Sequence, residues 1–288
     1  MRVVRSKRGV REQIREWRGA GERVAFVPTM GSFHEGHLSL MRRARRVADR
    51  VVLSIYVNPT QFAPHEDFAA YPRDTRRDLL LARGERVDLA YLPAPTTFYA
   101  SDHATAVRVT GLESVLEGAS RPGHFAGVAL VVLKLLHLTE PDVLVLGRKD
   151  AQQALILERM IGELDLPVRV VRAPIVRDHD GLALSSRNRY LNPDQRAAAL
   201  VLSRSLREVV ALVRGGERSA TRLKNLVRRA FAREPGALLD YVAVVDAHDL
   251  VPVARLCGRV LVPLAAHVGK TRLIDNAEFT ITPGRKGR

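Results

Sequence analysis

The feature that most constrains this chain is an alternation of short apolar segments with segments of helical periodicity along its first two-thirds. The apolar segments are rich in Val, Ile and Leu, and several are apolar on both faces, which is typical of parallel strands covered by helices. The predicted strands cover residues 23–29, 50–58, 87–93, 142–147 and 168–174. This alternation predicts an open, mostly parallel α/β sheet.

The pattern changes near residue 177. Residues 178–181 have the composition of a turn, and Asn192 followed by Pro193 is typical of a helix start. Two helical stretches then precede three short strand-like segments, "LLDYVAVVDA", "RVLVPLAAHV" and "TRLIDN". We therefore predict a parallel α/β domain at residues 1–176 and a smaller α+β domain at residues 177–288. The final seven residues, "TPGRKGR", are expected to form a frayed tail.

Composition favours a globular protein of the cytoplasm. Hydrophobic residues make up 46% of the 288 residues and charged residues 27%, which is enough apolar material for a large core. Cys257 is the only cysteine, so no intrachain disulfide can form. The N-terminal residues are charged throughout and lack the apolar centre of a signal peptide. No segment is long and apolar enough to span a membrane, and we expect no membrane partner.

The net charge of +15 raises the question of a nucleic-acid partner. The arginines are scattered along the whole chain, aromatic residues make up only 5%, and no basic patch is interleaved with aromatics. We therefore expect no nucleic-acid partner. A small substrate that carries phosphate suits the same charge.

The stretch "FVPTMGSFHEGHLSLMRRAR" joins the end of a predicted strand to the start of a predicted helix. Ligands of open α/β sheets bind beyond the carboxyl ends of the strands, and a helix N-terminus there favours phosphate. Gly31 and Gly36 allow the backbone to approach a ligand closely. His34 and His37 could then stabilise negative charge on phosphate oxygens. A lone histidine at a helix start more often caps or packs, but this pair after an apolar strand favours a site.

Four more motifs extend this observation. In chain order the five are "PTMGSFHEGHLSL", "VNPTQFAPHEDFAAYPRD", "RPGHFAGVALVVLKLL", "GRKDAQQ" and "DGLALSSRNRYL". Together they resemble the pantothenate synthetase family, a branch of the nucleotidyltransferase superfamily that includes class I aminoacyl-tRNA synthetases. The resemblance covers residues 24–191 and is looser beyond them, where "TRLIDN" is the best match.

The resemblance implies a Rossmann-like N-terminal domain and a C-terminal domain that closes over the site. It also implies a ligase that condenses pantoate with β-alanine through a pantoyl adenylate, releasing AMP and pyrophosphate. A carboxylate is a poor acyl donor because oxide is a poor leaving group, and adenylation supplies AMP in its place. Mg²⁺ is expected to bind mainly through the ATP phosphates, with no dedicated protein site and Asp78 as an alternative ligand. A homodimer is also implied.

The same resemblance assigns residues to roles. The catalytic residues are His34, His37 and Lys149, with His37 either the proton donor that the family implies or a stabiliser of charge on the α-phosphate. Asn58, Gln61 and Gln153 are assigned to pantoate, and Gln61 also to β-alanine. The residues assigned to ATP are Met30, Gly31, Ser32, Phe33, His34, Glu35, Gly36, His37, Gly147, Arg148, Lys149, Asp150, Val176, Leu184, Ser185, Ser186 and Arg187.

Several of these assignments have simpler alternatives. Asp150 could act only as the N-cap of a helix that begins at Ala151, and Lys149 could be a solvated neighbour. The chain departs from the family pattern at Arg148, where Glu is common, and at Leu184, where Met is usual. Arg121 and His124 match a family motif near the reacting groups.

Two other functions compete with the ligase. One is transfer of AMP to a phosphorylated metabolite, and the motifs "VNPTQF" and "RPGHFAG" speak against it. The other is a synthetase-like tRNA-binding module, but the sequence contains neither an anticodon-binding domain nor a zinc knuckle.

Overall fold

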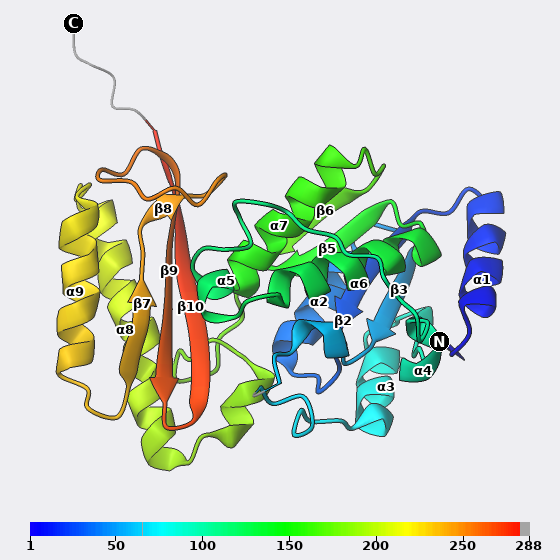
Figure 1. The fold of residues 1–288 in the computed structure, drawn as a ribbon, viewed down its shortest axis with the longest axis horizontal. Helices are drawn as coiled ribbons and strands as arrows, with labels where there is room; N and C mark the ends of the chain where they lie inside the picture. The colour runs from blue at the N-terminus through cyan, green and yellow to red at the C-terminus, as the bar shows by residue number, and fades with distance from the viewer. Residues whose placement is uncertain (65, 283–288) are drawn as a thin grey trace, which may run out of the picture. The chain divides into compact units, whose positions relative to one another are not determined.

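The structure, a computed structural model, describes residues 1–64 and 66–282 (Figure 1). All but the first residue of the expected C-terminal tail lies outside the described residues. The chain forms two units, Met1–Arg148 with Gln152–Val176, and Lys149–Ala151 with Arg177–Arg288. Residues 149–151 thus group with the second unit, whereas the sequence pattern predicts them in the first domain.

The first unit is built on a six-stranded sheet in the order β1-β4-β3-β2-β5-β6, with every neighbouring pair parallel. This confirms the predicted α/β class. Strand β1 is not predicted by the sequence pattern, because three residues are too few to show a period. The strands are β1 (Arg2–Val4), β2 (Val24–Thr29), β3 (Arg50–Ile55), β4 (Leu89–Tyr91), β5 (Val143–Gly147) and β6 (Arg169–Ala173).

Helices and 3-10 turns connect these strands. The helices are α1 (Lys7–Gly19), α2 (Glu35–Arg45), α3 (Thr75–Gly84), α4 (Pro95–Phe98), α5 (Glu117–Ser120), α6 (His124–Thr139) and α7 (Ala151–Glu163). The 3-10 turns are η1 (Pro59–Gln61) and η2 (Arg148–Asp150).

The core of the first unit lies on both faces of β2. Ala25 and Val27 pack in one cluster with Met41 and Ala44 of α2 and with Ala82 of α3. Because side chains alternate along a strand, the buried Phe26 between them points to the opposite face, where α6 contacts β2. A strand covered on both faces is uniformly apolar, and this explains why the sequence of β2 lacks the alternation of a surface strand.

The strand order sets the position of a ligand site in this sheet. The chain proceeds from β2 through β3 to β4 on one side, and then from β5 to β6 on the other, so the order reverses between β2 and β5. In open α/β sheets ligands bind at this switch point, beyond the carboxyl ends of the strands. The segments that follow Thr29 and Gly147 begin there.

The second unit is an antiparallel sheet packed against two helices, as the predicted α+β class requires. Its strands are β7 (Leu238–Val242), β8 (Val245–Asp246), β9 (Gly258–Val268) and β10 (Thr271–Ile281), with β9 between β7 and β10. Its helices are α8 (Pro193–Arg214) and α9 (Ala220–Ala232), and η3 (Ser186–Tyr190) precedes them. Leu202, Leu223 and Val262 share the core between helices and sheet.

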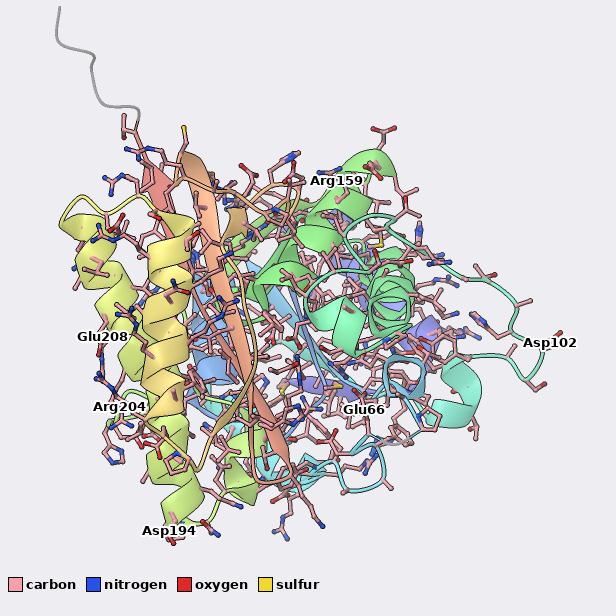
Figure 2. All side chains as sticks on the ribbon, turned by 60° about the vertical axis from the view of Figure 1, so that its left-hand side comes forward. Glu66, Asp102, Arg159, Asp194, Arg204 and Glu208 are labelled. Atoms are coloured by element: carbon pink, nitrogen blue, oxygen red, sulfur yellow. The ribbon has the colours of Figure 1, made fainter. Side chains whose placement is uncertain are left out.

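Local sequence explains the start of α8. The Asn192 side chain accepts a hydrogen bond from the Gln195 backbone N–H, and the Gln195 side chain accepts one from the Asn192 N–H. This reciprocal capping box, with Pro193 in the first turn, forms the helix start that the sequence predicted. Charged side chains such as Asp194, Arg204 and Glu208 lie on the outer face of α8 (Figure 2).

Among the described residues, none of the helices has the length and apolarity needed to cross a membrane.

The packing of α6 on η1 makes Gly127 sensitive to substitution. A Cβ at Gly127 would lie 2.3 Å from the Thr60 carbonyl oxygen and 2.8 Å from the Gln61 backbone nitrogen. Because both atoms belong to the backbone, η1 would have to move. We expect Gly127→Ala to lower the free energy of unfolding by about 1–3 kcal/mol, measured by urea denaturation.

Gly162→Ala in α7 is the matched control, because a Cβ added there would meet nothing within 4 Å. This control should raise stability by up to about 1 kcal/mol, since alanine is the better helix former. Equal midpoints for the two variants would contradict the packing described here.

Candidate active site

The turn between β2 and α2 holds the two predicted catalytic histidines. His34 is the N-cap residue of α2 and has an extended backbone. Its N–H donates a long, 3.4 Å hydrogen bond to Nδ1 of His37, and the two ring centroids are 4.1 Å apart. An accepting Nδ1 places the proton of the neutral His37 ring on Nε2, so this nitrogen is the donor of the ring. The structure therefore brings the pair together at a helix N-terminus.

A buried carboxylate beneath the turn sets its shape. Asp78 of α3 is 1% exposed, and its two oxygens accept hydrogen bonds from the backbone N–H groups of Ser32 and Phe33, both at 2.8 Å. Gly31 and Ser32 have φ angles of +85° and +56°. A Cβ on Gly31 would lie 2.8 Å from the Asp78 carboxylate, so glycine is required by both space and backbone angle. Burial raises the pKa of Asp78, and the two N–H donors oppose that shift.

These contacts bear on the alternative that Asp78 binds Mg²⁺. Both carboxylate oxygens already accept backbone hydrogen bonds. The side chain thus anchors the loop on which several predicted ATP ligands lie. Among the described residues, no three His, Cys, Asp or Glu side chains are placed to hold a metal ion.

The side chains of Asn58, which caps η1, and Gln61, which ends it, differ in how much of their hydrogen-bonding capacity is used within the protein. Nδ2 of Asn58 donates to the Gln61 side chain at 3.2 Å and to the Gly127 carbonyl at 3.1 Å. Oδ1 of Asn58 accepts from the hydroxyls of Tyr99 and Thr60, both at 3.0 Å. Asn58 thus has its hydrogen-bonding capacity filled within the protein. Its assignment as a direct pantoate ligand stays a prediction.

Gln61 keeps more capacity than Asn58. One hydrogen of Nε2 points to Sδ of Met30 at 3.2 Å, and Oε1 accepts from Asn58. An amide has two donors and two acceptor lone pairs, so one hydrogen and one lone pair remain for a ligand among the described contacts. The contact also places Gln61 beside Met30, which is a predicted ATP ligand.

Gln152 and Gln153 differ in a similar way, since only one of them is used fully within the protein. Nε2 of Gln152 donates to the carbonyls of Leu112 and Val115 at 2.7 and 2.8 Å, and Oε1 accepts from the Glu117 N–H. Gln152 is therefore a structural amide that ties α7 to the segment before α5, a role that no sequence pattern indicates. Gln153, the predicted pantoate ligand, is only half-buried.

Within the second unit, Lys149 and Asp150 lie together in η2. Nζ of Lys149 is 3.4 Å from Oδ1 of Asp150. The buried Asn276 of β10 donates from Nδ2 to the Lys149 carbonyl at 2.9 Å. "TRLIDN" thus supplies a direct contact to a predicted catalytic residue, which the sequence pattern alone did not reveal.

The segment 184–187 begins directly after a hairpin that is held in place by ion pairs. Arg177 and Ala183 form an antiparallel bridge, and Arg177 makes two hydrogen bonds to the buried Asp275 at 2.7 and 3.0 Å. Arg196 holds the same hairpin through Asp178 and Asp180 at 2.7 and 2.8 Å.

The remaining predicted ATP ligands have simple local settings. Ser185 is the N-cap residue of η3, and its hydroxyl accepts from the Arg187 N–H at 3.3 Å. Leu184 is half-buried. Gly147 ends β5, Arg148 begins η2, and Val176 closes the first unit.

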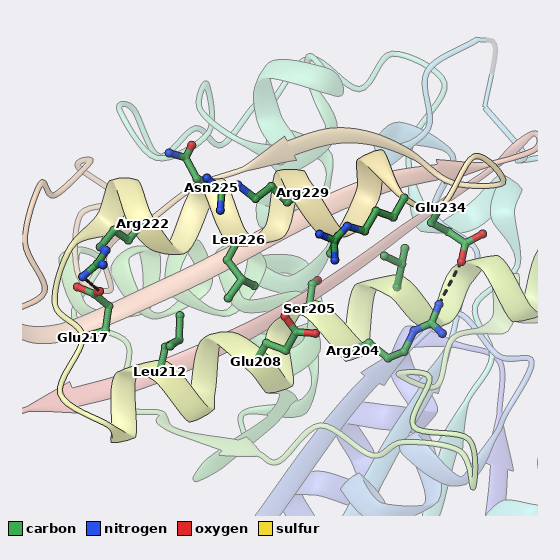
Figure 3. Close-up of a pocket in the computed structure, with 13 residues that line it drawn as sticks. Arg204, Ser205, Glu208, Leu212, Glu217, Arg222, Asn225, Leu226, Arg229 and Glu234 are labelled. Atoms are coloured by element: carbon green, nitrogen blue, oxygen red, sulfur yellow. Dashed lines mark hydrogen bonds and ion pairs between the residues drawn. The ribbon is translucent and has the colours of Figure 1, made fainter.

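A separate surface groove with a volume of 830 Å³ lies between α8 and α9 (Figure 3). Glu208 and Leu212 line it from α8, and Leu226 and Arg229 line it from α9. Ion pairs between Arg204 and Glu234 and between Arg222 and Glu217 lie at its ends. None of its lining residues is a predicted ligand.

We predict that Asp78→Asn destabilises the protein, because an amide has one acceptor oxygen and would turn its NH₂ group toward a backbone N–H. Leaving a buried donor unsatisfied costs about 1–3 kcal/mol, so the urea midpoint should fall. The matched control is Asp74→Asn in the same helix, where the side chain caps the Arg77 N–H at 3.0 Å and asparagine caps equally well. Equal midpoints for both variants would refute the anchoring role of Asp78.

Comparisons with known proteins agree with this arrangement. The family model described as "Pantoate-beta-alanine ligase" matches residues 2–278. The pantothenate synthetase of Heliobacterium modesticaldum is 51% identical over 276 residues, which are 96% of this chain and 98% of that protein. A crystal structure of pantothenate synthetase from Thermus thermophilus is similar with a TM-score of 0.91 and 41% identity, covering 96% of this chain and 99% of that one.

A third protein adds information about ligands. The crystal structure of pantoate-beta-alanine ligase from Francisella tularensis, described as complexed with "Beta-gamma ATP and Beta-alanine", has a TM-score of 0.76 and 31% identity to this chain. It covers 96% of this chain and 97% of its own. With a family match over nearly the whole length and relatives of this similarity, the chain belongs to the pantoate–β-alanine ligase family.

Proposed function

We propose that this chain condenses pantoate with β-alanine to pantothenate, consuming ATP and releasing AMP and pyrophosphate. Membership of the ligase family supports this activity, and the Francisella tularensis relative is described with an ATP compound and β-alanine. The observation that carries the proposal is the paired His34 and His37 turn at the switch point of the sheet. That position suits a nucleotide phosphate.

The reaction needs two displacements. In the first, a carboxylate oxygen of pantoate forms a bond to the α-phosphorus of ATP while the bond to the bridging oxygen breaks, and pyrophosphate leaves. In the second, the amine of β-alanine attacks the acyl carbon, AMP leaves and the nitrogen loses a proton. The first step depends on positioning and on stabilising charge at the phosphorus oxygens.

The N-terminus of α2 supplies that stabilisation in this proposal. Its first backbone N–H groups and the positive end of its dipole favour negative charge. We assign Nε2 of His37 as the donor toward an α-phosphate oxygen, with Nδ1 facing the His34 N–H. Donation from Nε2 stabilises charge without requiring proton transfer, so we favour this role over that of a proton donor.

The other predicted ligands complete the proposal. We assign Lys149, Ser185, Ser186 and Arg187 to the phosphates, because ammonium, hydroxyl and guanidinium groups all donate to phosphate oxygens. Asp150 is assigned to the nucleotide, and the departures at Arg148 and Leu184 leave these donors unchanged. These assignments rest on the family resemblance and on the contacts within each unit.

For the acyl substrates we propose Gln61 and Gln153. Gln61 retains one donor and one acceptor in the described structure, enough to hold a hydroxyl or carboxylate of pantoate and then the amine or carboxylate of β-alanine. In this proposal Asn58 supports the Gln61 side chain through a hydrogen bond and is not a second ligand.

We propose that Mg²⁺ enters with ATP and is held mainly by the phosphates, since Mg²⁺ prefers phosphate oxygens and keeps several waters. The contacts of Asp78 agree with this, because its oxygens are used by the backbone. When bound, the ion would offset charge on the phosphates. Action as a homodimer in the cytoplasm is also proposed from the family resemblance, and sedimentation analysis would test the dimer.

The order of chemistry gives the first test of the proposed function. Pantoate alone should support exchange of labelled pyrophosphate into ATP, because the adenylate forms before β-alanine takes part. Addition of β-alanine should then yield pantothenate and AMP, measured by mass spectrometry. Exchange that strictly requires β-alanine would rule out a free-standing adenylation step, and absence of pantothenate would refute the activity.

A second test isolates the role of His37. In His37→Asn, the side-chain oxygen can still accept from the His34 N–H, but the Nε2 donor is lost. We expect adenylation in a single turnover to slow about a hundredfold, corresponding to roughly 2.7 kcal/mol, with little loss of stability. His137→Asn is the control, since His137 is exposed on α6. A folded His37→Asn enzyme with the wild-type rate would show that His37 does not act on the phosphate.

A further inference from the structure

The first turn of α6 holds a histidine in one defined protonation state. His124 is 9% exposed, with Nδ1 2.8 Å from the Gln61 carbonyl oxygen and Nε2 3.0 Å from Nη1 of Arg121. A guanidinium only donates, so Nε2 must accept and the single proton must reside on Nδ1, which donates to Gln61. Burial, followed by the charge of Arg121, lowers the pKa of His124 to about 4, in agreement with a neutral ring.

Arg121 is tied into the same small structure. Its Nε and Nη2 donate to the two carboxylate oxygens of Glu66 at 2.5 and 2.8 Å, and Nη2 also lies 3.4 Å from the Gln61 carbonyl oxygen. Glu66 further accepts from the Ala63 N–H at 3.2 Å. Both Arg121 and Glu66 have only 15% of their side-chain surface exposed. Most of the donors of Arg121 are therefore used before any substrate binds.

A second set of contacts holds η1 and its N-cap residue in place through Gly127 of α6. The Cα of Gly127 packs so closely against the Thr60 carbonyl that no Cβ would fit. The Gly127 carbonyl accepts from Asn58. The chain is thus held at positions 58, 60 and 61, before the side chain of Gln61 reaches Met30.

We propose that His124, Arg121 and Glu66 are positioning residues that hold Gln61 in place for the acyl substrates. This inference rests on the proposed function, because it takes Gln61 as the ligand of pantoate and β-alanine. His124 and Arg121 act through the Gln61 backbone rather than by binding substrate. The ring nitrogens of His124 and the guanidinium donors of Arg121 are directed at protein atoms. The neutral His124 ring also adds no charge beside a carboxylate substrate.

The test is a double-mutant cycle between positions 124 and 61. His124→Phe keeps a ring of similar size but removes both hydrogen bonds. We expect KM for pantoate and β-alanine to rise about tenfold or more, with KM for ATP changed less than about threefold. In the Gln61→Ala background, His124→Phe should have little further effect on KM, because the side chain that His124 positions is already gone.

A conservative variant separates positioning from bulk packing. The Nδ2 group of asparagine can occupy the place of Nδ1 in histidine, so His124→Asn retains a donor for the Gln61 carbonyl. We expect it to recover most of the loss seen with phenylalanine. His137→Phe on the exposed side of the same helix is the control and should leave all KM values unchanged.

Three results would overturn the positioning role. They are unchanged KM values in His124→Phe, full additivity with Gln61→Ala, and failure of His124→Asn to recover. If His124→Phe does not fold, Glu66→Gln decides the question, because it weakens the Arg121 pair without touching the helix. It should raise KM for both acyl substrates, and unchanged values would refute the role.

The wild-type enzyme separates this inference from the proposed function. A wild-type chain that makes no pantothenate refutes the proposed function, and the inference falls with it. An active wild-type enzyme with one of the overturning results refutes the positioning role alone.

Discussion

The candidate site depends on one buried carboxylate, that of Asp78, beneath the turn between β2 and α2. Its two oxygens accept the Ser32 and Phe33 N–H groups, in a space that only glycine at position 31 leaves open. Two charge-assisted hydrogen bonds of this kind are stronger than neutral ones and fix the backbone just before the histidine pair. Without this anchor, the helix N-terminus and the two rings would not be held in a defined geometry at the switch point.

In the first unit, some neutral amide side chains form internal hydrogen bonds that support the site, and others are proposed to bind substrate. Asn58 and Gln152 are buried and use their amide groups to join separate segments of chain. Their neighbours Gln61 and Gln153 keep hydrogen-bonding capacity or exposure for a substrate. A preorganised ligand group needs such support, because an amide that can rotate loses the benefit of its position.

Arginine has a similar supporting role. Arg121 clamps Glu66 next to η1, Arg177 clamps Asp275 before the segment 184–187, and Arg196 clamps Asp178 and Asp180 in the same hairpin. Planar guanidinium groups suit this use because they bind a carboxylate through two parallel donors. Each of these clamps joins side chains from different positions around a loop or hairpin, so we interpret them as devices for loop geometry. Part of the excess of basic residues thus has a structural use.

The sequence by itself determined the α/β class, five of the six parallel strands and the placement of the histidine motif at a strand end. These features follow from local patterns, because an apolar run between turn residues forms the same kind of strand wherever it packs. The predicted site residues were found by their motifs, and their roles stay predictions.

Only the tertiary structure decided which side chains support the site. Asp78 is 46 residues from Ser32, and His124 is 63 residues from Gln61, yet each pair is joined by a hydrogen bond of 2.8 Å. Sequence patterns alone therefore gave no indication that Asp78 anchors the turn before α2, or that Asn58 and Gln152 join separate segments of chain. A local pattern specifies the direction of a side chain relative to its own strand or helix. Which distant segment it meets is set by how the elements pack together.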